Sequence, residues 1–138
     1  MDGPLLLDTC AAIWISNDDA ISEQVRVAVD RAHQERESIY ISPITAWELG
    51  LLVARGRLNL SISPQHWFFR LLQTAGLRLA DMQPEILINS SFLPGTPPRD
   101  PADRIIATTA REYGYTLVTR DRPLLDYARH GHISVLEC

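Results

Sequence analysis

Lysine is absent from the 138-residue chain, and all 13 of its basic residues are arginine. Mechanisms that need a lysine amine are therefore excluded. Cysteine is also scarce: Cys10 and Cys138 lack the spacing of a zinc site or a disulfide framework, which favours a reducing compartment. No apolar run approaches the length of a membrane span, and no basic-then-apolar leader precedes Leu5. We therefore expect a cytoplasmic protein that does not enter the membrane.

Glycine-rich phosphate-binding loops are missing too, since neither a G-x-G-x-x-G nor a Walker pattern occurs. The composition is that of an ordinary globular protein, 46% apolar and 22% charged, with a net charge of −4. This balance argues against disorder and against a protein that is basic overall. The length suits one domain spanning residues 1–138 with a sizeable core.

Short apolar runs alternate with helical patterns along the chain. The predicted strands cover residues 5–7, 39–41, 77–79, 116–119 and 133–136. The first predicted helix begins after Asp8. The others cover about 22–33, 43–56, 64–76, 84–92, 101–113 and 123–129. Strands connected through helices pair in parallel, and such crossovers are right-handed. We predict an α/β fold of three layers, in which about five parallel strands carry helices on both faces.

The segment Arg99–Ala110 begins a helix with two carboxylates three residues apart. Asp100 suits the N-cap, Pro101 the first helical position, and Asp103 the N3 position at the positive end of the helix dipole. One interpretation is a variant capping box, in which both acids accept backbone N–H groups. The other is that Asp103 points into a crevice overlooked by the helix.

Three other acids and a hydroxyl group occupy comparable places. Asp8 follows the first strand and Asp121 the fourth, where each is either a helix N-cap or a ligand at the edge of the sheet. Glu48 lies among apolar neighbours, so it is either solvated or turned inward toward a partner or a metal. Thr119, at the end of the fourth strand, could hold a ligand or a water. Strand ends and the starts of the following helices share one edge, so all four acids should meet there.

Four carboxylates in one pocket repel one another unless cations are bound. Ligands that are all oxygen suit Mg²⁺ or Mn²⁺ rather than zinc. A site of this kind activates water and hydrolyses phosphodiesters. Receiver domains and haloacid-dehalogenase-like phosphatases also have acidic Mg²⁺ sites, but both require the lysine that this chain lacks.

Four motifs occur in order: Leu-Leu-Leu-Asp-Thr at 5–9, Trp-Glu at 47–48, Asp-Pro-Ala-Asp-Arg-Ile-Ile-Ala at 100–107 and Leu-Val-Thr-Arg-Asp at 117–121. Together they resemble PIN-domain ribonucleases, especially VapC-type toxins of bacterial toxin–antitoxin pairs, over nearly the whole chain. The resemblance implies a dimeric, Mg²⁺- or Mn²⁺-dependent endoribonuclease inhibited by a cognate antitoxin. It implies that Asp8, Glu48, Asp103 and Asp121 are the catalytic and metal-binding acids, with Thr119 as the accompanying hydroxyl. Cys10 stands where relatives can have histidine.

Several arginines are candidates for contacts with RNA. Arg104, Arg120 and Arg122 flank the expected metal site and could guide RNA phosphates toward it. Arg104 could equally pair with a neighbouring carboxylate. Arg55 and Arg57 lie in a segment without acids, and they could contact RNA or an acidic antitoxin segment, or simply be solvated.

The expected partner is the antitoxin, in a heteromeric complex or bound to a homodimer. We expect it to insert a segment against the groove between the helices at 42–56 and 63–76. Trp67 and Phe69 in the second helix suit either a partner surface or the core. The alternative function is a catalytically silent PIN-like fold that only binds an antitoxin or RNA. Cleavage of RNA that depends on metal distinguishes the two.

Overall fold

The computed structural model describes residues 3–138. Its strands are β1 (Leu5–Leu7), β2 (Ile39–Ile41), β3 (Leu77–Leu79), β4 (Thr116–Thr119) and β5 (Ser134–Glu137). Its helices are α1 (Thr9–Ser16), α2 (Glu23–Gln34), α3 (Ile44–Ala54), α4 (Pro64–Gln73), α5 (Pro84–Asn89), α6 (Pro101–Tyr113) and α7 (Arg122–Arg129). The strands form one parallel sheet in the order β3-β2-β1-β4-β5. Within this range, no helix has the length and apolar character needed to cross a membrane.

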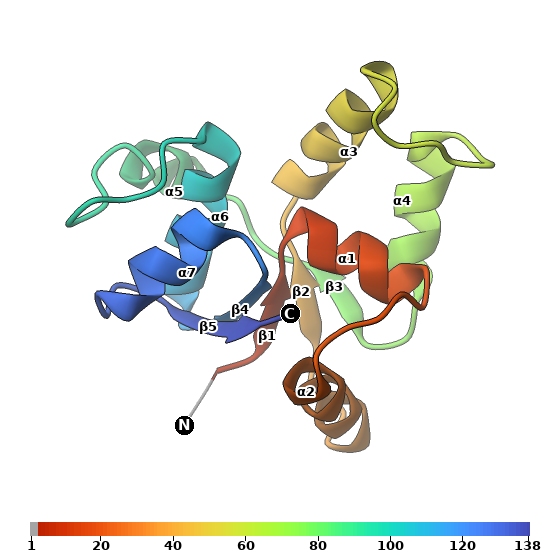
Figure 1. The fold of residues 1–138 in the computed structure, drawn as a ribbon, viewed down its shortest axis with the longest axis horizontal. Helices are drawn as coiled ribbons and strands as arrows, with labels where there is room; N and C mark the ends of the chain where they lie inside the picture. The colour runs from red at the N-terminus through yellow and green to blue at the C-terminus, as the bar shows by residue number, and fades with distance from the viewer. Residues whose placement is uncertain (1–2) are drawn as a thin grey trace.

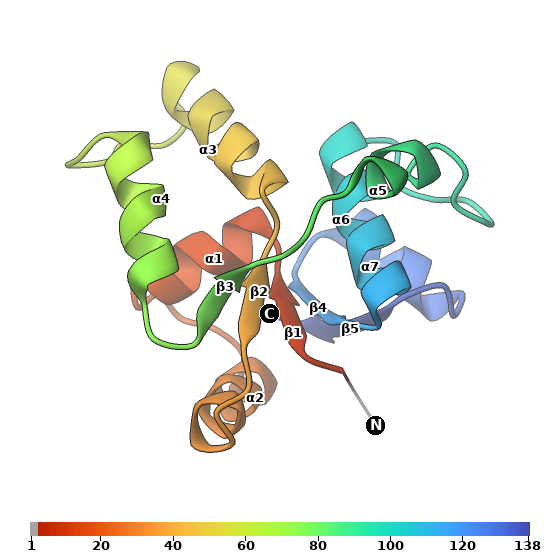
Figure 2. The same ribbon diagram turned by 180° about the vertical axis from the view of Figure 1, so that it is seen from behind.

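The sheet separates two groups of helices, with α1, α2 and α4 on one side and α6 and α7 on the other (Figures 1 and 2). Side chains alternate along a strand, so neighbouring leucines of β1 enter different cores. Leu7 packs in the same core as Val25 and Leu71, whereas Leu6 packs with Ile106 and Leu117. Both leucines are almost fully buried. The predicted α/β fold with three layers and five parallel strands is confirmed.

The strand order reverses between β1 and β4, whose carboxyl ends lie side by side. From β1 the chain proceeds outward through β2 and β3, then returns to the other side of β1 as β4. Ligands of open α/β sheets bind at such a reversal. Leu7 pairs with Val118, and the Asp8 N–H donates to the Val118 carbonyl (3.1 Å). Asp8 therefore emerges from the sheet beside Thr119.

The structure corrects several helix ends. The helix predicted from residue 43 begins one residue later, because Pro43 is the N-cap and α3 begins at Ile44. The Ser42 hydroxyl still accepts a hydrogen bond from the Ile44 N–H (3.1 Å). Helix α5 ends at Asn89 rather than near Phe92, and α4 ends at Gln73 rather than at Gly76. These differences lengthen the connections that follow α4 and α5 and leave the sheet edge unchanged.

Candidate active site

Asp8 is held by hydrogen bonds from two elements. Its Oδ1 accepts a hydrogen bond from the Ala11 N–H (2.7 Å), which makes it the N-cap of α1. Its Oδ2 accepts one from Thr119 Oγ1 (2.5 Å). Asp8 is 7% exposed and Thr119 is fully buried. The capping interpretation is therefore correct, and the same carboxylate also joins α1 to β4 at the edge of the sheet.

Asp121 is attached to the same hydroxyl. Thr119 Oγ1 accepts a hydrogen bond from the Asp121 N–H (3.0 Å). Asp121 is the N-cap of α7, and its Oδ2 accepts from the Leu124 N–H (3.4 Å). One buried hydroxyl thus ties together the backbone of Asp121 and the carboxylate of Asp8.

Glu48 is half-buried in α3, so it does not lie on a fully solvated stripe. Thr9 Oγ1 donates a 2.6 Å hydrogen bond to Glu48 Oε1, and the hydroxyls of Thr9 and Thr45 lie 3.1 Å apart. A hydroxyl has one proton, so we assign Thr9 as the donor to Glu48 and Thr45 as the donor to Thr9. Both threonines are buried. Sequence reasoning missed Thr9, although a hydroxyl directly after Asp8 was the available signal.

Asp103 is half-buried in the first turn of α6. Its N–H donates to Asp100 Oδ2 (3.0 Å), so Asp100 is the N-cap as predicted. The Asp103 carboxylate itself accepts no hydrogen bond from residues 3–138, so the reciprocal half of the capping box is not formed. Burial, followed by the charges of Asp121, Asp100, Glu48 and Asp8, raises the pKa of Asp103 to about 8.

The four carboxylates lie within electrostatic reach of one another. Burial is the largest influence that raises the pKa of Asp8 and of Glu48, and the charge of Asp121 adds to both. Partial desolvation and the same charges raise the pKa of the Cys10 thiol to about 11. Between residues 3 and 138, however, no three Asp, Glu, His or Cys side chains already form a metal-ligand cluster. The structure therefore places the acids near one another, but their side chains do not yet form a set of metal ligands.

The raised pKa of Asp103 predicts that the metal-free protein loses stability as pH rises. The folded protein keeps a proton on Asp103 up to about pH 8, whereas the ordinary value is 3.8. Between these values the folded state binds more protons than the unfolded state, so the free energy of unfolding falls with increasing pH. In EDTA, the Tm should fall from about pH 5 to about pH 8. Asp103→Asn should flatten this profile, and an unchanged slope would contradict the explanation.

Arg104 holds the loop before α6. Its Nε donates to the Ser90 carbonyl (2.9 Å) and its Nη1 to the Pro98 carbonyl (3.0 Å). The predicted alternative of an ion pair with a neighbouring carboxylate is therefore wrong. Backbone carbonyls are the partners of this guanidinium.

Arg120 and Arg122 follow β4 but differ in their contacts. The Arg120 guanidinium lies 3.8 Å from the centroid of the Trp14 ring and donates to the Cys138 carbonyl (3.2 Å). It joins α1 to the end of the chain. Arg122 is exposed and forms no ion pair with any residue from 3 to 138. Of the three arginines, Arg122 is the most available to a ligand.

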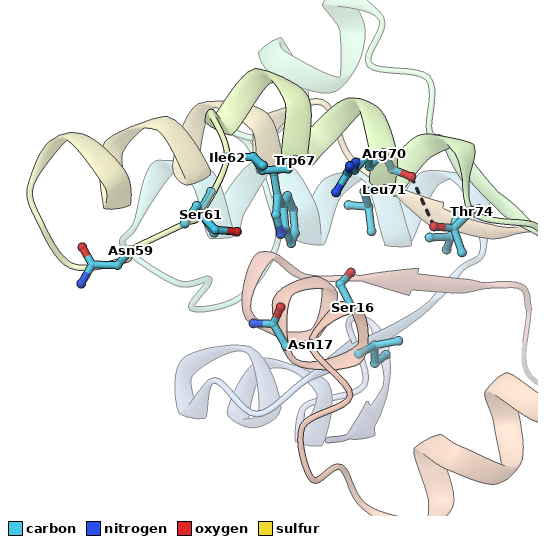
Figure 3. A pocket seen from close by; sticks show the side chains of 12 residues that line it. Ser16, Asn17, Asn59, Ser61, Ile62, Trp67, Arg70, Leu71 and Thr74 are labelled. Carbon is cyan, nitrogen blue, oxygen red and sulfur yellow. Dashed lines mark hydrogen bonds between the residues drawn. The ribbon is translucent and has the colours of Figure 1, made fainter.

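A hollow of about 520 Å³ lies between the end of α1 and helix α4, away from the acids (Figure 3). Trp67, Arg70 and Leu71 line it from α4, and Asn17 lines it from the opposite side. The lining contains no carboxylate, imidazole or thiol. This hollow cannot supply acid–base or metal chemistry. Trp67 also packs against the core, whereas Phe69 is 59% exposed.

The family model of the PIN domain matches residues 5–130, a range that includes the four acids and Thr119. The chain belongs to the PIN domain family. Ribonuclease VapC22 of Mycobacterium tuberculosis (strain ATCC 25618 / H37Rv) is 32% identical over 131 residues, which cover 95% of this chain and 97% of that protein. These matches confirm the resemblance to VapC-type PIN domains indicated by the four motifs.

Solved structures share this PIN fold over nearly its full length. One is VapBC2 from Rickettsia felis bound to a DNA fragment from their promoter, with a TM-score of 0.68, 17% identity and coverage of 98% of both chains. Another is FitAcB from Neisseria gonorrhoeae, with a TM-score of 0.57, 26% identity and coverage of 96% of both chains. At 17% identity, the similarity to VapBC2 shows a shared fold alone.

Proposed function

We propose that the protein is a Mg²⁺- or Mn²⁺-dependent endoribonuclease toxin that hydrolyses RNA phosphodiester bonds and is inhibited by a cognate antitoxin. The observation that carries the proposal is the gathering of Asp8, Glu48, Asp103 and Asp121 at the carboxyl edge of the sheet. The similarity to a protein named ribonuclease VapC22 supports the same reaction. We treat residues 1–138 as one catalytic domain that works in the cytoplasm.

The donor set fits Mg²⁺ or Mn²⁺, because all four candidate ligands are carboxylates. Asp8, Glu48, Asp103 and Asp121 would hold the cation. Burial and mutual repulsion raise the pKa of three of these groups, and a divalent cation would relieve the repulsion. When bound, the metal would supply a water of lowered pKa and stabilise the charge that develops on the phosphoryl group.

The hydrogen bonds distinguish fixed acids from a movable one. Asp8 and Asp121 are held at helix starts and through Thr119. The Asp103 carboxylate has no such bond within residues 3–138, so it can turn toward an attacking water. In hydrolysis the water oxygen bonds to phosphorus, the bond to the leaving ribose oxygen breaks, and the water proton passes to a base. We assign Asp103 to orienting that water or accepting its proton.

Among the flanking arginines, we propose Arg122 as the contact to RNA phosphates. It is exposed and follows the acidic edge directly, where a guanidinium attracts a polyanion. Arg104 and Arg120 already donate to backbone carbonyls. We infer that they support the loops around the site and add positive charge near the path of the RNA.

The test is incubation of antitoxin-free protein with cellular RNA in Mg²⁺, Mn²⁺ or EDTA. Discrete cuts that need metal are the expected result. No cutting under any condition, with the antitoxin shown to be absent, would favour the catalytically silent binding module instead.

Thr9→Val should weaken Mn²⁺ binding by about 10-fold or more, since partners that orient metal ligands have effects of that size. The substitution removes the hydroxyl that holds Glu48 Oε1 while keeping the side-chain volume. Isothermal titration calorimetry with Mn²⁺ measures the effect, and Thr9→Ser should restore binding. Thr74→Val is the matched control, because the Thr74 hydroxyl donates only to the Arg70 carbonyl. Wild-type affinity in Thr9→Val would refute the positioning role.

Helix α3 offers a surface for the antitoxin. Most of its residues are apolar, yet Thr45 and Leu49 are its only buried residues. Trp47 on this helix is 55% exposed, and Phe69 on the adjacent α4 is 59% exposed. Apolar helices are normally covered. We propose that the antitoxin lays an apolar segment over α3 and α4, and the solved complexes named VapBC2 and FitAcB support a paired partner.

Trp47→Ser should weaken binding of the antitoxin by roughly 30-fold, the effect of removing an aromatic anchor worth about 2 kcal/mol. Co-purification with a tagged antitoxin, followed by calorimetry, measures the change. Val27→Ser on α2 is the control, because Val27 is 46% exposed on another part of the surface. Equal binding by the two variants would place the antitoxin elsewhere.

A further inference from the structure

A second hollow, of about 460 Å³, adjoins the acidic edge. It lies between the proline-rich loop before α6, the first turn of α6 and the outer side of α7, elements that lie together in both ribbon views (Figures 1 and 2). Asp103 lines it, so the hollow borders the candidate active site at this residue. A phosphodiester held at Asp103 would bring its neighbouring nucleoside to the mouth of this hollow.

The loop that forms one wall is fixed from two helices. Arg104 of α6 donates to the Pro98 carbonyl (3.0 Å), and Tyr127 of α7 donates its hydroxyl to the Pro94 carbonyl (2.6 Å). Gly95 has a φ of +70°, and a Cβ there would lie 2.4 Å from His132 Nε2. The wall is therefore preorganised, which reduces the entropy that a ligand loses on binding.

The lining suits a nucleobase. It is mainly apolar, with Pro97, Pro98 and Pro123 offering flat carbon surfaces on which a base can lie. The carboxylates of Asp100 and Asp126 border the same space. Carboxylates accept hydrogen bonds from base N–H groups, as acidic side chains do from the amino group of cytosine. Arg99 and His130 line the same hollow and add donors to it.

We propose that this hollow, which we term the base pocket, holds the nucleobase next to the cleaved phosphate and selects bases with an exocyclic amino group. The proposal rests on the proposed ribonuclease function. Asp126 is the residue we assign to the amino group, because it lies on the rim and its other contact is a surface ion pair with Arg129 (3.5 Å). Uracil, which presents a carbonyl where cytosine has its amino group, is the disfavoured base.

The direct test is an NMR titration of the ¹⁵N-labelled full chain with cytidine and with uridine. Cytidine should shift the amide resonances of Thr96, Arg99, Asp100 and residues 126–130 and bind roughly 2- to 10-fold more tightly than uridine, the effect of one hydrogen bond. Asp126→Asn should remove this difference. Asp30→Asn is the matched control, since Asp30 forms a comparable surface pair with Arg26 on α2. Shifts elsewhere, no shifts, or equal binding of the two nucleosides would overturn the proposal.

A cleavage assay separates this proposal from the function on which it rests. In a randomised RNA pool with Mn²⁺, the wild type should cut so that uracil is underrepresented on one side of the cleaved bonds. In cuts made by Asp126→Asn, the frequency of uracil at that position should return to its frequency in the pool. Cuts that ignore the flanking base would overturn the base pocket and leave the ribonuclease intact. Selective binding of cytidine without any cutting would support the pocket and contradict the ribonuclease.

Discussion

Asp103→Asn is expected to lower the rate of RNA cleavage by roughly a hundredfold or more, since metal-assisted charge stabilisation contributes several kcal/mol to such reactions. The substitution keeps the side-chain shape and the hydrogen bond from the Asp103 N–H to Asp100, but removes one charge. It also removes the free-energy cost of keeping this half-buried carboxyl protonated above its ordinary pKa, so the metal-free variant should be at least as stable as the wild type. Asp8→Asn should lower cleavage similarly, because it removes a charge of the candidate metal site. Asparagine keeps an oxygen for capping α1, so the fold should be retained.

Initial rates on the RNA target and Tm values in EDTA measure both parts of this expectation. Asp30→Asn on α2 is the control, since it removes an exposed carboxylate that is not one of the four acids. Full activity in purified Asp103→Asn or Asp8→Asn would refute the assignment of these acids. Lost activity accompanied by a large fall in Tm would also count against it, because the loss would then be one of folding.

Thr119→Val is expected to lower the free energy of unfolding by about 2 kcal/mol and cleavage by about 10- to 100-fold. The fully buried hydroxyl donates to Asp8 Oδ2 and accepts from the Asp121 N–H. Valine fills the same volume but leaves both groups without this partner. The carboxylate of Asp8 and the loop carrying Asp121 would then lose their common support. Thr119→Ser should recover most of the activity.

Thr116→Val provides a matched control in the same strand. Thr116 is also buried, but its hydroxyl has no hydrogen-bond partner within residues 3–138. Removing an unpaired buried hydroxyl should leave stability unchanged or raise it by up to about 1 kcal/mol. Urea denaturation compares the two variants. Equal destabilisation by both would show that the hydrogen bonds of Thr119 contribute nothing specific.

The sheet and its acidic edge follow from local features of the sequence. A run such as Leu5–Leu7 is buried on both faces, so continuous apolar character marks a central parallel strand. Alternation with helices then predicts parallel pairing, and the acids after the strands fall at one edge. Asp8 and Asp121 both cap helices, as one of their two interpretations predicted, and their charges also reach Asp103. Their role as ligands stays a prediction.

The contacts that the sequence could not reveal join segments far apart in the chain. Thr9 meets Glu48 across 39 residues, and no spacing rule relates them because α1 and α3 pack only in the folded state. Arg104 was expected near phosphates or carboxylates, but it donates to carbonyls of an irregular loop whose path depends on prolines and a glycine. No periodic pattern of residues in the sequence indicates the geometry of that loop or the hollow beside it.

The most direct test of the acidic site is anomalous diffraction from crystals grown with Mn²⁺. The proposed function predicts a Mn²⁺ peak at the carboxyl ends of β1 and β4, beside the carboxylates of Asp8, Glu48, Asp103 and Asp121. The same peak should be missing from crystals of Asp103→Asn. A peak at another place on the chain, or no peak at saturating Mn²⁺, would contradict a metal-dependent active site built from these four carboxylates.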